Sequence, residues 1–150
     1  MTNGPDIPAS NITREQVLDT LQNDWATYVE RFHHLSPEEQ SAFLAQQGYA
    51  RLGDLLGHVI AWWEQGLPAV EKYLVDPSFK PADQDVDTFN ARAVARFQPI
   101  DESTVIQTFD RMRQAWVDLV TRLPEQAFQN EKIAFQLHIE LIGHLAEHAL

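Results

Sequence analysis

The stretch Lys132–Leu150, KIAFQLHIELIGHLAEHAL, sets the expectation for the whole chain. At 100° per residue, an α-helix gathers five of its side chains into one sector: Leu137, Leu141, His144, Leu145 and His148. This sector is the apolar stripe that faces a core. His144 and His148 are four residues apart, so they stack one turn above the other. Two imidazoles in a buried stripe are unfavourable unless hydrogen bonds or a metal ion satisfy them.

Three further segments have the same helical periodicity. The first begins near Asn11, the second runs from about Arg51 to Gln65, and the third runs from about Thr104 to Leu123. Ser36, Pro37 and Glu39 predict the start of a shorter helix that ends near Gly48, and Gly66 and Pro68 predict a bend after the second segment.

Residues 75–86 have the prolines and turn formers of a long connection, and a short helix over TFNARAVARF follows them. No segment alternates as a strand does. We therefore predict an all-α protein: a four-helix bundle over residues 11–150, with a long crossover carrying a short extra helix. Residues 1–10 are expected to form a flexible arm.

The composition excludes several classes of function. The formal net charge is -11, and the eleven basic residues form no cluster of three or more, which argues against nucleic-acid binding. No apolar run approaches the ~20 residues of a membrane span. The chain has no cysteine, so it forms no disulfide, thiolate metal site or cysteine nucleophile. We expect a cytoplasmic protein without a membrane partner, and a homodimer is possible through exposed helix faces.

The pair His144 and His148 offers two nitrogen ligands to one ion, and a third must come from another helix. His58 is the best candidate, because it is the one histidine of its helix and borders the apolar face. Three histidines leave coordination positions open for water or substrate, as in catalytic sites. Zinc and nickel both suit such ligands. Alternatively, His144 is a hydrogen-bonded core residue and His148 a helix-terminal one.

Other polar and aromatic residues have two interpretations each. His33 and His34 end the first helix and are expected to be exposed, and His138 lies off the main stripe and is expected to be structural. Glu140 and Glu147 border the histidine pair. They are either supporting partners or bases for the site, or solvated helix residues. Trp62 and Trp63 line a pocket beside His58 or pack in the core.

Two motifs give the chain a likeness to known proteins. LGDLLGHVIAWWE (residues 52–64) and GHLAEH (residues 143–148) resemble those of the DinB-like (DinB/YfiT) superfamily of four-helix bundles. In that superfamily a histidine of the second helix and an HxxxH pair of the last helix form a metal triad, which implies His58, His144 and His148. VDTFNARAVARFQPID (residues 86–101) looks most similar to the ClbS/DfsB family, where Asn90 would be the matching asparagine. With Trp62, Asn90 is the expected pocket residue.

This resemblance implies an enzyme, a divalent-metal-dependent hydrolase or thiol S-transferase that acts on a small electrophilic molecule. The nucleophile would be water or a low-molecular-weight thiol such as bacillithiol or glutathione, since the protein has no thiol of its own. The alternatives are a metal-free module that binds or sequesters an apolar molecule among Trp25, Trp62, Trp63 and Trp116, and a structural protein whose histidines only pack.

Overall fold

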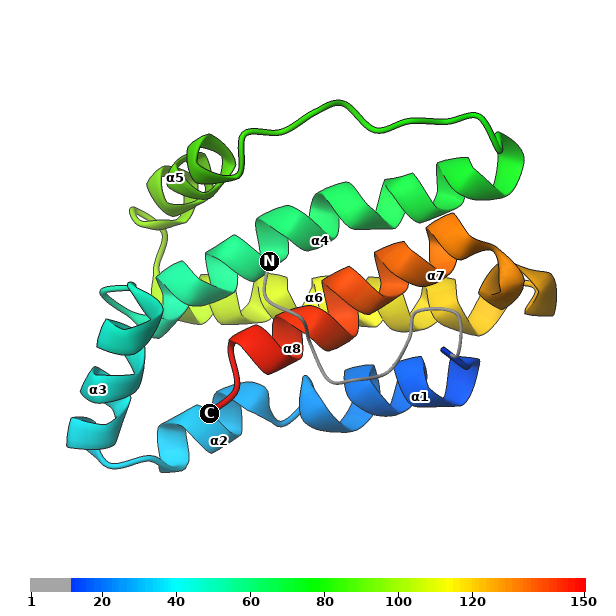
Figure 1. Ribbon diagram of the computed structural model, residues 1–150. Coiled ribbons are helices and arrows are strands. Elements are labelled where there is room, and N and C mark those ends of the chain that lie inside the picture. The colour runs from blue at the N-terminus through cyan, green and yellow to red at the C-terminus, as the bar shows by residue number, and fades with distance from the viewer. Residues whose placement is uncertain (1–11) are drawn as a thin grey trace.

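The computed structural model describes residues 12–150, and within this range the chain folds into helices without any strand (Figure 1). The predicted all-α class is confirmed. The proposed N-terminal arm, residues 1–10, and the predicted start near Asn11 lie outside the described residues. The α-helices are α1 (Arg14–Asp19), α2 (Tyr28–His34), α3 (Pro37–Gln47), α4 (Leu52–Val75), α5 (Val86–Phe97), α6 (Glu102–Arg122), α7 (Glu131–Leu137) and α8 (His144–Glu147). Two π-helical turns, η2 (Thr20–Asp24) and η4 (His138–Gly143), and one 3₁₀ turn, η3 (Glu125–Gln129), connect some of them.

The long helices lie side by side (Figure 1). Helix α4 packs against both α6 and α7, while α1 packs against α6 and the two π-helical turns touch each other. Helix α5 packs on the outer side of α4, after the connection over residues 76–85. None of the helices in residues 12–150 has the length and apolarity needed to cross a membrane.

Local sequence explains where several helices begin and end. Thr13 and Ser36 cap α1 and α3, and each forms the reciprocal pair of hydrogen bonds of a capping box with the residue three positions on. Gly48 ends α3 with φ 84°, a left-handed conformation that glycine adopts without strain. The predicted boundaries of α3 are confirmed.

Helix α4 differs from the prediction. The sequence predicts a helix to about Gln65, a bend at Gly66 and Pro68, and a resumption through Val70, Tyr73 and Leu74. The structure has one continuous helix to Val75 with Pro68 inside it. The last turns bury Ala69, Val70 and Tyr73 against the core. Apolar burial on this face outweighs the single backbone hydrogen bond that the proline removes.

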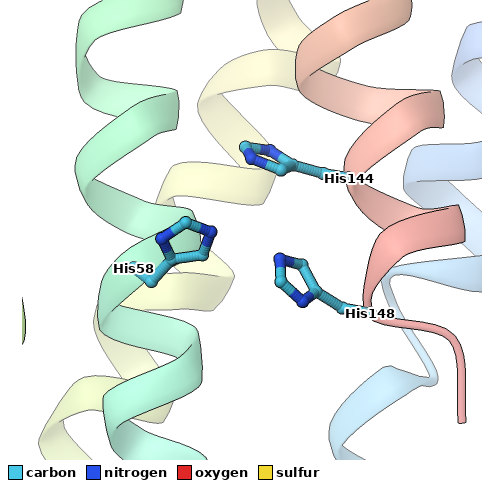
Figure 2. A group of neighbouring side chains, drawn as sticks. All are labelled: His58, His144 and His148. Atoms are coloured by element: carbon cyan, nitrogen blue, oxygen red, sulfur yellow. The ribbon is translucent and has the colours of Figure 1, made fainter. Parts of the chain in front are cut away.

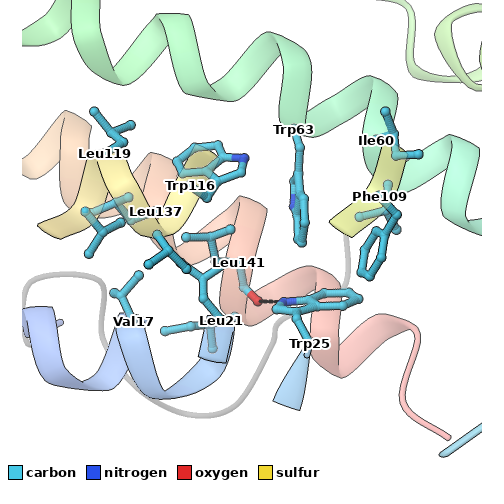
Figure 3. Packing of buried hydrophobic residues seen from close by; sticks show 14 of the residues in the cluster. Val17, Leu21, Trp25, Ile60, Trp63, Phe109, Trp116, Leu119, Leu137 and Leu141 are labelled. Carbon is cyan, nitrogen blue, oxygen red and sulfur yellow. Dashed lines mark hydrogen bonds between the residues drawn. The ribbon is translucent and has the colours of Figure 1, made fainter. Parts of the chain in front are cut away.

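Aromatic side chains fill the centre of the protein (Figure 3). Trp25, Trp63 and Phe109 meet with ring centroids 5.1 to 5.9 Å apart, and Trp25 and Trp63 are completely buried. Both indoles donate to backbone carbonyls of η4: Trp25 to Leu141 at 2.9 Å and Trp63 to Glu140 at 2.8 Å. These bonds fix the last helical segment against the rest of the core.

Candidate metal centre

Three histidines from two distant parts of the sequence converge in the interior. His58 lies on α4, His144 begins α8, and His148 follows its last residue. Their side chains point toward one another (Figure 2), and one ring nitrogen from each lies within 4.8 Å of the other two. All three residues are buried, with 7%, 3% and 6% of their surface exposed. The structure therefore brings the three predicted ligands together.

Asn90 orients His58. Its Oδ1 accepts a hydrogen bond of 2.8 Å from Trp62 Nε1, which is a donor only, so this atom is the amide oxygen. The same oxygen lies 3.1 Å from His58 Nδ1, so His58 Nδ1 carries the hydrogen. His58 Nε2 is then unprotonated, with its lone pair available.

A π-helical turn orients His144. In this turn the backbone N–H of His144 donates to Ile139 instead of Glu140, so it leaves the Glu140 carbonyl free. That carbonyl accepts from Trp63 Nε1 and, at 3.0 Å, from His144 Nδ1. A carbonyl oxygen only accepts, so His144 also has its proton on Nδ1.

Gln47 at the end of α3 orients His148. Its amide nitrogen donates to the Glu147 carbonyl at 3.2 Å, and its amide oxygen accepts from His148 Nδ1 at 2.7 Å. Tyr28 holds the same turn through a 2.6 Å bond from its hydroxyl to the His148 carbonyl. His148 Nε2 is buried and has no hydrogen-bond partner. Gln47 and Tyr28 therefore both hold the last helical turn, which carries His148, in place.

The electrostatics of the cluster favour neutral rings. Burial lowers the pKa of His58 and His144 to about 4, and for His144 the neighbouring His58 adds to the effect. Burial, with smaller contributions from His58 and His144, lowers the pKa of His148 to about 3. Three neutral imidazoles whose Nε2 lone pairs point toward one another repel each other. A cation would satisfy all three.

Glu140 is buried rather than solvated, which corrects one of its two predicted interpretations. It is 1% exposed, and its side chain lies against Gly66 on α4, where a Cβ would be 1.9 Å from Glu140 Oε2. Gln136 Nε2 donates to Oε2 at 3.4 Å. The absence of a side chain at Gly66 therefore makes the room for this carboxyl group.

Glu140 and His144 are neighbours without being an ion pair. Glu140 Oε1 is 3.9 Å from His144 Nδ1. Burial raises the pKa of Glu140 to about 8 and lowers that of His144, so both groups are neutral at pH 7. Glu140 lies on the Nδ1 side of His144, away from the shared Nε2 space.

The other predicted residues divide between site and scaffold. His33 and His34 are exposed as expected. His138 is half-buried, with a pKa lowered by burial, and lies outside the cluster. Glu147 is half-buried, and its Oε1 has no hydrogen-bond partner. Leu145, expected in the buried stripe, is half-buried and packs against the core.

Three of the four tryptophans lie in the core. Trp25, Trp63 and Trp116 are each 0% exposed and pack in the core. Trp62 is half-buried and lines a cavity beside His144.

Sequence reasoning missed three features of the site: the Gln47 clamp, the role of Gly66 and the free Glu140 carbonyl. Each depends on a contact between residues far apart in the chain. No local pattern could have revealed these contacts.

Comparison with known proteins gives a partial likeness. No protein-family model matches the chain, and no solved structure matches it. Thiosulfate sulfurtransferase GlpE from Actinobacillus succinogenes is 36% identical over 68 residues, which cover 45% of this chain and 61% of that protein. The chain therefore spans less than two thirds of the curated relative that it matches. The matched part is less than half of this chain and assigns no activity to it.

Proposed function

We propose that this protein is a divalent-metal-dependent enzyme of the DinB-like type, closest to the ClbS/DfsB family, with a four-helix bundle as its framework. Four long helical units support the bundle: α1–α2, α4, α6 and α7–α8 lie side by side, and α5 belongs to the crossover after α4. The motif-based likeness to the superfamily supports the same reading, because its three motif histidines are those that meet in the interior.

One observation carries the proposal. His58, His144 and His148 each donate from Nδ1 to an acceptor on a different structural unit, which directs three unprotonated Nε2 atoms toward one another. Metal-binding histidines in proteins have this pattern, with the second nitrogen held by an outer partner. The buried Nε2 of His148, which has no hydrogen-bond partner, suits a metal ligand. We propose zinc or nickel as the ion, because both suit an all-nitrogen ligand set.

When bound, such an ion supplies Lewis-acid chemistry to a substrate or nucleophile. The residues of this chain orient the ligands and exclude water. Asn90, Gln47 and the Glu140 carbonyl keep the three rings in one tautomer and orientation, and the aromatic core excludes water on one side. The proposed reactions are hydrolysis and thiol transfer on a small electrophile. A thiol must come from a cosubstrate, since the chain has no cysteine.

The proposal is tested with protein loaded with zinc or nickel. Hydrolysis is followed with 4-nitrophenyl acetate, and thiol transfer with 1-chloro-2,4-dinitrobenzene in the presence and absence of a thiol. Thiosulfate with a thiol acceptor is included because of the GlpE likeness. We expect at least one rate to require the metal, to be lost in His58→Ala and to persist in His34→Ala. Equal rates with and without metal in every assay would contradict an enzymatic role.

A binding or sequestration module is the second candidate, and the cavity beside Trp62 favours it. It predicts saturable binding of a small molecule without turnover, whether or not a metal is present. Quenching of tryptophan fluorescence by such a molecule, in protein that shows no metal-dependent reaction, would support this candidate over the enzyme.

A further inference from the structure

A cavity of about 320 Å³ adjoins the histidine cluster. It lies between α4, the connection before α5, and the segment formed by α7 and η4. His144 and Trp62 line it, and Trp62 also shares the Asn90 oxygen with His58. A molecule in this cavity would therefore lie beside the proposed metal ligands.

One part of the cavity wall is apolar. Trp62 and Ala69 face it from α4, Ile139 from η4, and Pro81 and Val86 from the connection and the start of α5. Trp62 is held in place by its hydrogen bond to Asn90 and by Phe89, whose ring centroid is 4.1 Å away. The wall offers a fixed aromatic face to the apolar part of a ligand.

The polar part of the wall carries amides and acids but no lysine or arginine. Three glutamines line it, Gln65, Gln84 and Gln136, and each can donate and accept hydrogen bonds. The two acidic residues are Asp83 and Glu140. Arg92 and Arg96 line a neighbouring surface hollow instead, where Arg96 pairs with Glu64 at 2.8 Å.

We propose that this cavity binds the body of an uncharged small molecule with an apolar part and an amide or carbonyl group, and discriminates against carboxylates. A carboxylate in the cavity would lose hydration without gaining a cationic partner, and Asp83 would repel it. An amide keeps its hydrogen bonds through the glutamine side chains. The inference rests on the proposed function, since the metal would contact only the reacting group. It disfavours an anionic thiol such as glutathione as the molecule seated here.

The test compares two probes that share a benzyl group, phenylacetamide and phenylacetate. The protein is first freed of bound ions with a chelator, so that no metal attracts the carboxylate. Binding is followed by NMR through the indole N–H signal of Trp62, which is assigned by its loss in Trp62→Phe. We expect phenylacetamide to shift this signal saturably, with a Kd at least about tenfold below that of phenylacetate.

A matched pair of variants tests the cause. Gln84→Lys adds an ammonium group to the cavity wall, on an exposed position that should not disturb folding. Gln114→Lys makes the same change in net charge on the exposed side of α6. We expect only Gln84→Lys to strengthen phenylacetate binding. Equal or tighter binding of phenylacetate to the unaltered protein, or no binding of phenylacetamide, would overturn the inference.

The design separates the cavity from the metal. Metal content is measured on the untreated sample from which the chelated protein is made. Bound metal without amide selectivity would overturn the ligand class and leave the proposed enzyme intact. Amide selectivity without any metal binding would support the cavity and contradict the metal-dependent function.

Discussion

Two pairs of histidines lie at helix ends in this protein, and their surroundings are opposite. His33 and His34 end α2 and are exposed to water. His144 and His148 bracket α8 and are buried with His58. Adjacent residues diverge by about 100° around a helix, whereas residues four apart share a face. The four-residue spacing puts His144 and His148 on one buried helix face. Hydrogen-bond acceptors on other elements then orient their rings toward a common point.

The largest effect is expected from removing a ligand of the buried cluster. His144→Ala and His58→Ala should each abolish stabilisation by zinc or nickel, because a ligand that binds only the native state raises its stability. At a free metal concentration 100 times Kd, the unaltered protein should gain about 2.7 kcal/mol, and the variants should gain none. The measurement is the melting temperature with and without metal.

His34→Ala is the matched control, since it removes a histidine from the exposed pair. It should keep the full metal-dependent rise in melting temperature. If the unaltered protein, His34→Ala and His144→Ala all melt alike with and without metal, the distinction between the two pairs has no functional meaning.

The next effect is the response of the metal-free protein to acid. The pKa of each cluster histidine lies at about 3 to 4 in the native state, below its ordinary value of 6.5. Between pH 6.5 and 4 the unfolded chain takes up protons that the native state refuses, so stability falls as pH falls. The slope is at most about 1.4 kcal/mol per pH unit for each histidine.

Glu140 acts in the opposite direction. Its native pKa of about 8 lies above its ordinary 4.5, so its contribution is complete below pH 4.5 and is lost as pH rises toward 8. Two histidine variants that both keep Glu140 can be compared, because its contribution is the same in each. Urea unfolding at several pH values should give a shallower acid loss for His148→Gln than for His34→Gln. Parallel profiles for the two variants would refute the inferred burial of neutral His148.

A smaller effect should follow from removing an outer partner. Gln47→Ala deletes the acceptor for His148 Nδ1 and the clamp on the last turn, and should weaken metal binding by about 10- to 100-fold. Gln46→Ala changes the exposed neighbour and should leave the affinity unchanged. Titration calorimetry with zinc measures both. A Gln47 variant with native affinity would show that the clamp plays no part in orienting the ligand.

The smallest effect concerns the indole bonds to the π-helical turn. Trp63→Phe and Trp116→Phe remove the same atoms from the core, but only Trp63 Nε1 has an acceptor, the Glu140 carbonyl. Trp63→Phe should therefore be the more destabilising by about 1 kcal/mol. Equilibrium urea unfolding measures this difference. Equal losses would mean that the indole bond does not stabilise the turn that presents His144.

Much of the fold could be predicted because its signals are local. Capping boxes at Thr13 and Ser36 and the glycine at position 48 act within one turn, and the apolar periodicity extends along each helix. The continuity of α4 through Pro68 was not predictable in this way, since it depends on burial against other helices.

The candidate site was predictable to the level of its ligands. The spacing of His144 and His148 puts them on one face, and His58 is the one histidine of its helix and borders the apolar face. The hydrogen-bond acceptors of His144 and His148 could not be predicted. The π-helical turn that frees the Glu140 carbonyl is held by tertiary bonds from Trp25 and Trp63. The burial of Glu140 depends on the lack of a side chain at Gly66, which lies far from it in the sequence.

The central claim is that three Nε2 atoms form a metal site. The most direct measurement is elemental analysis of protein purified without a histidine tag, beside His144→Ala and His34→Ala. The account predicts near-stoichiometric zinc or nickel in the unaltered protein and in His34→Ala, and none in His144→Ala. Absence of metal from all three, even after zinc and nickel are added back, would contradict it.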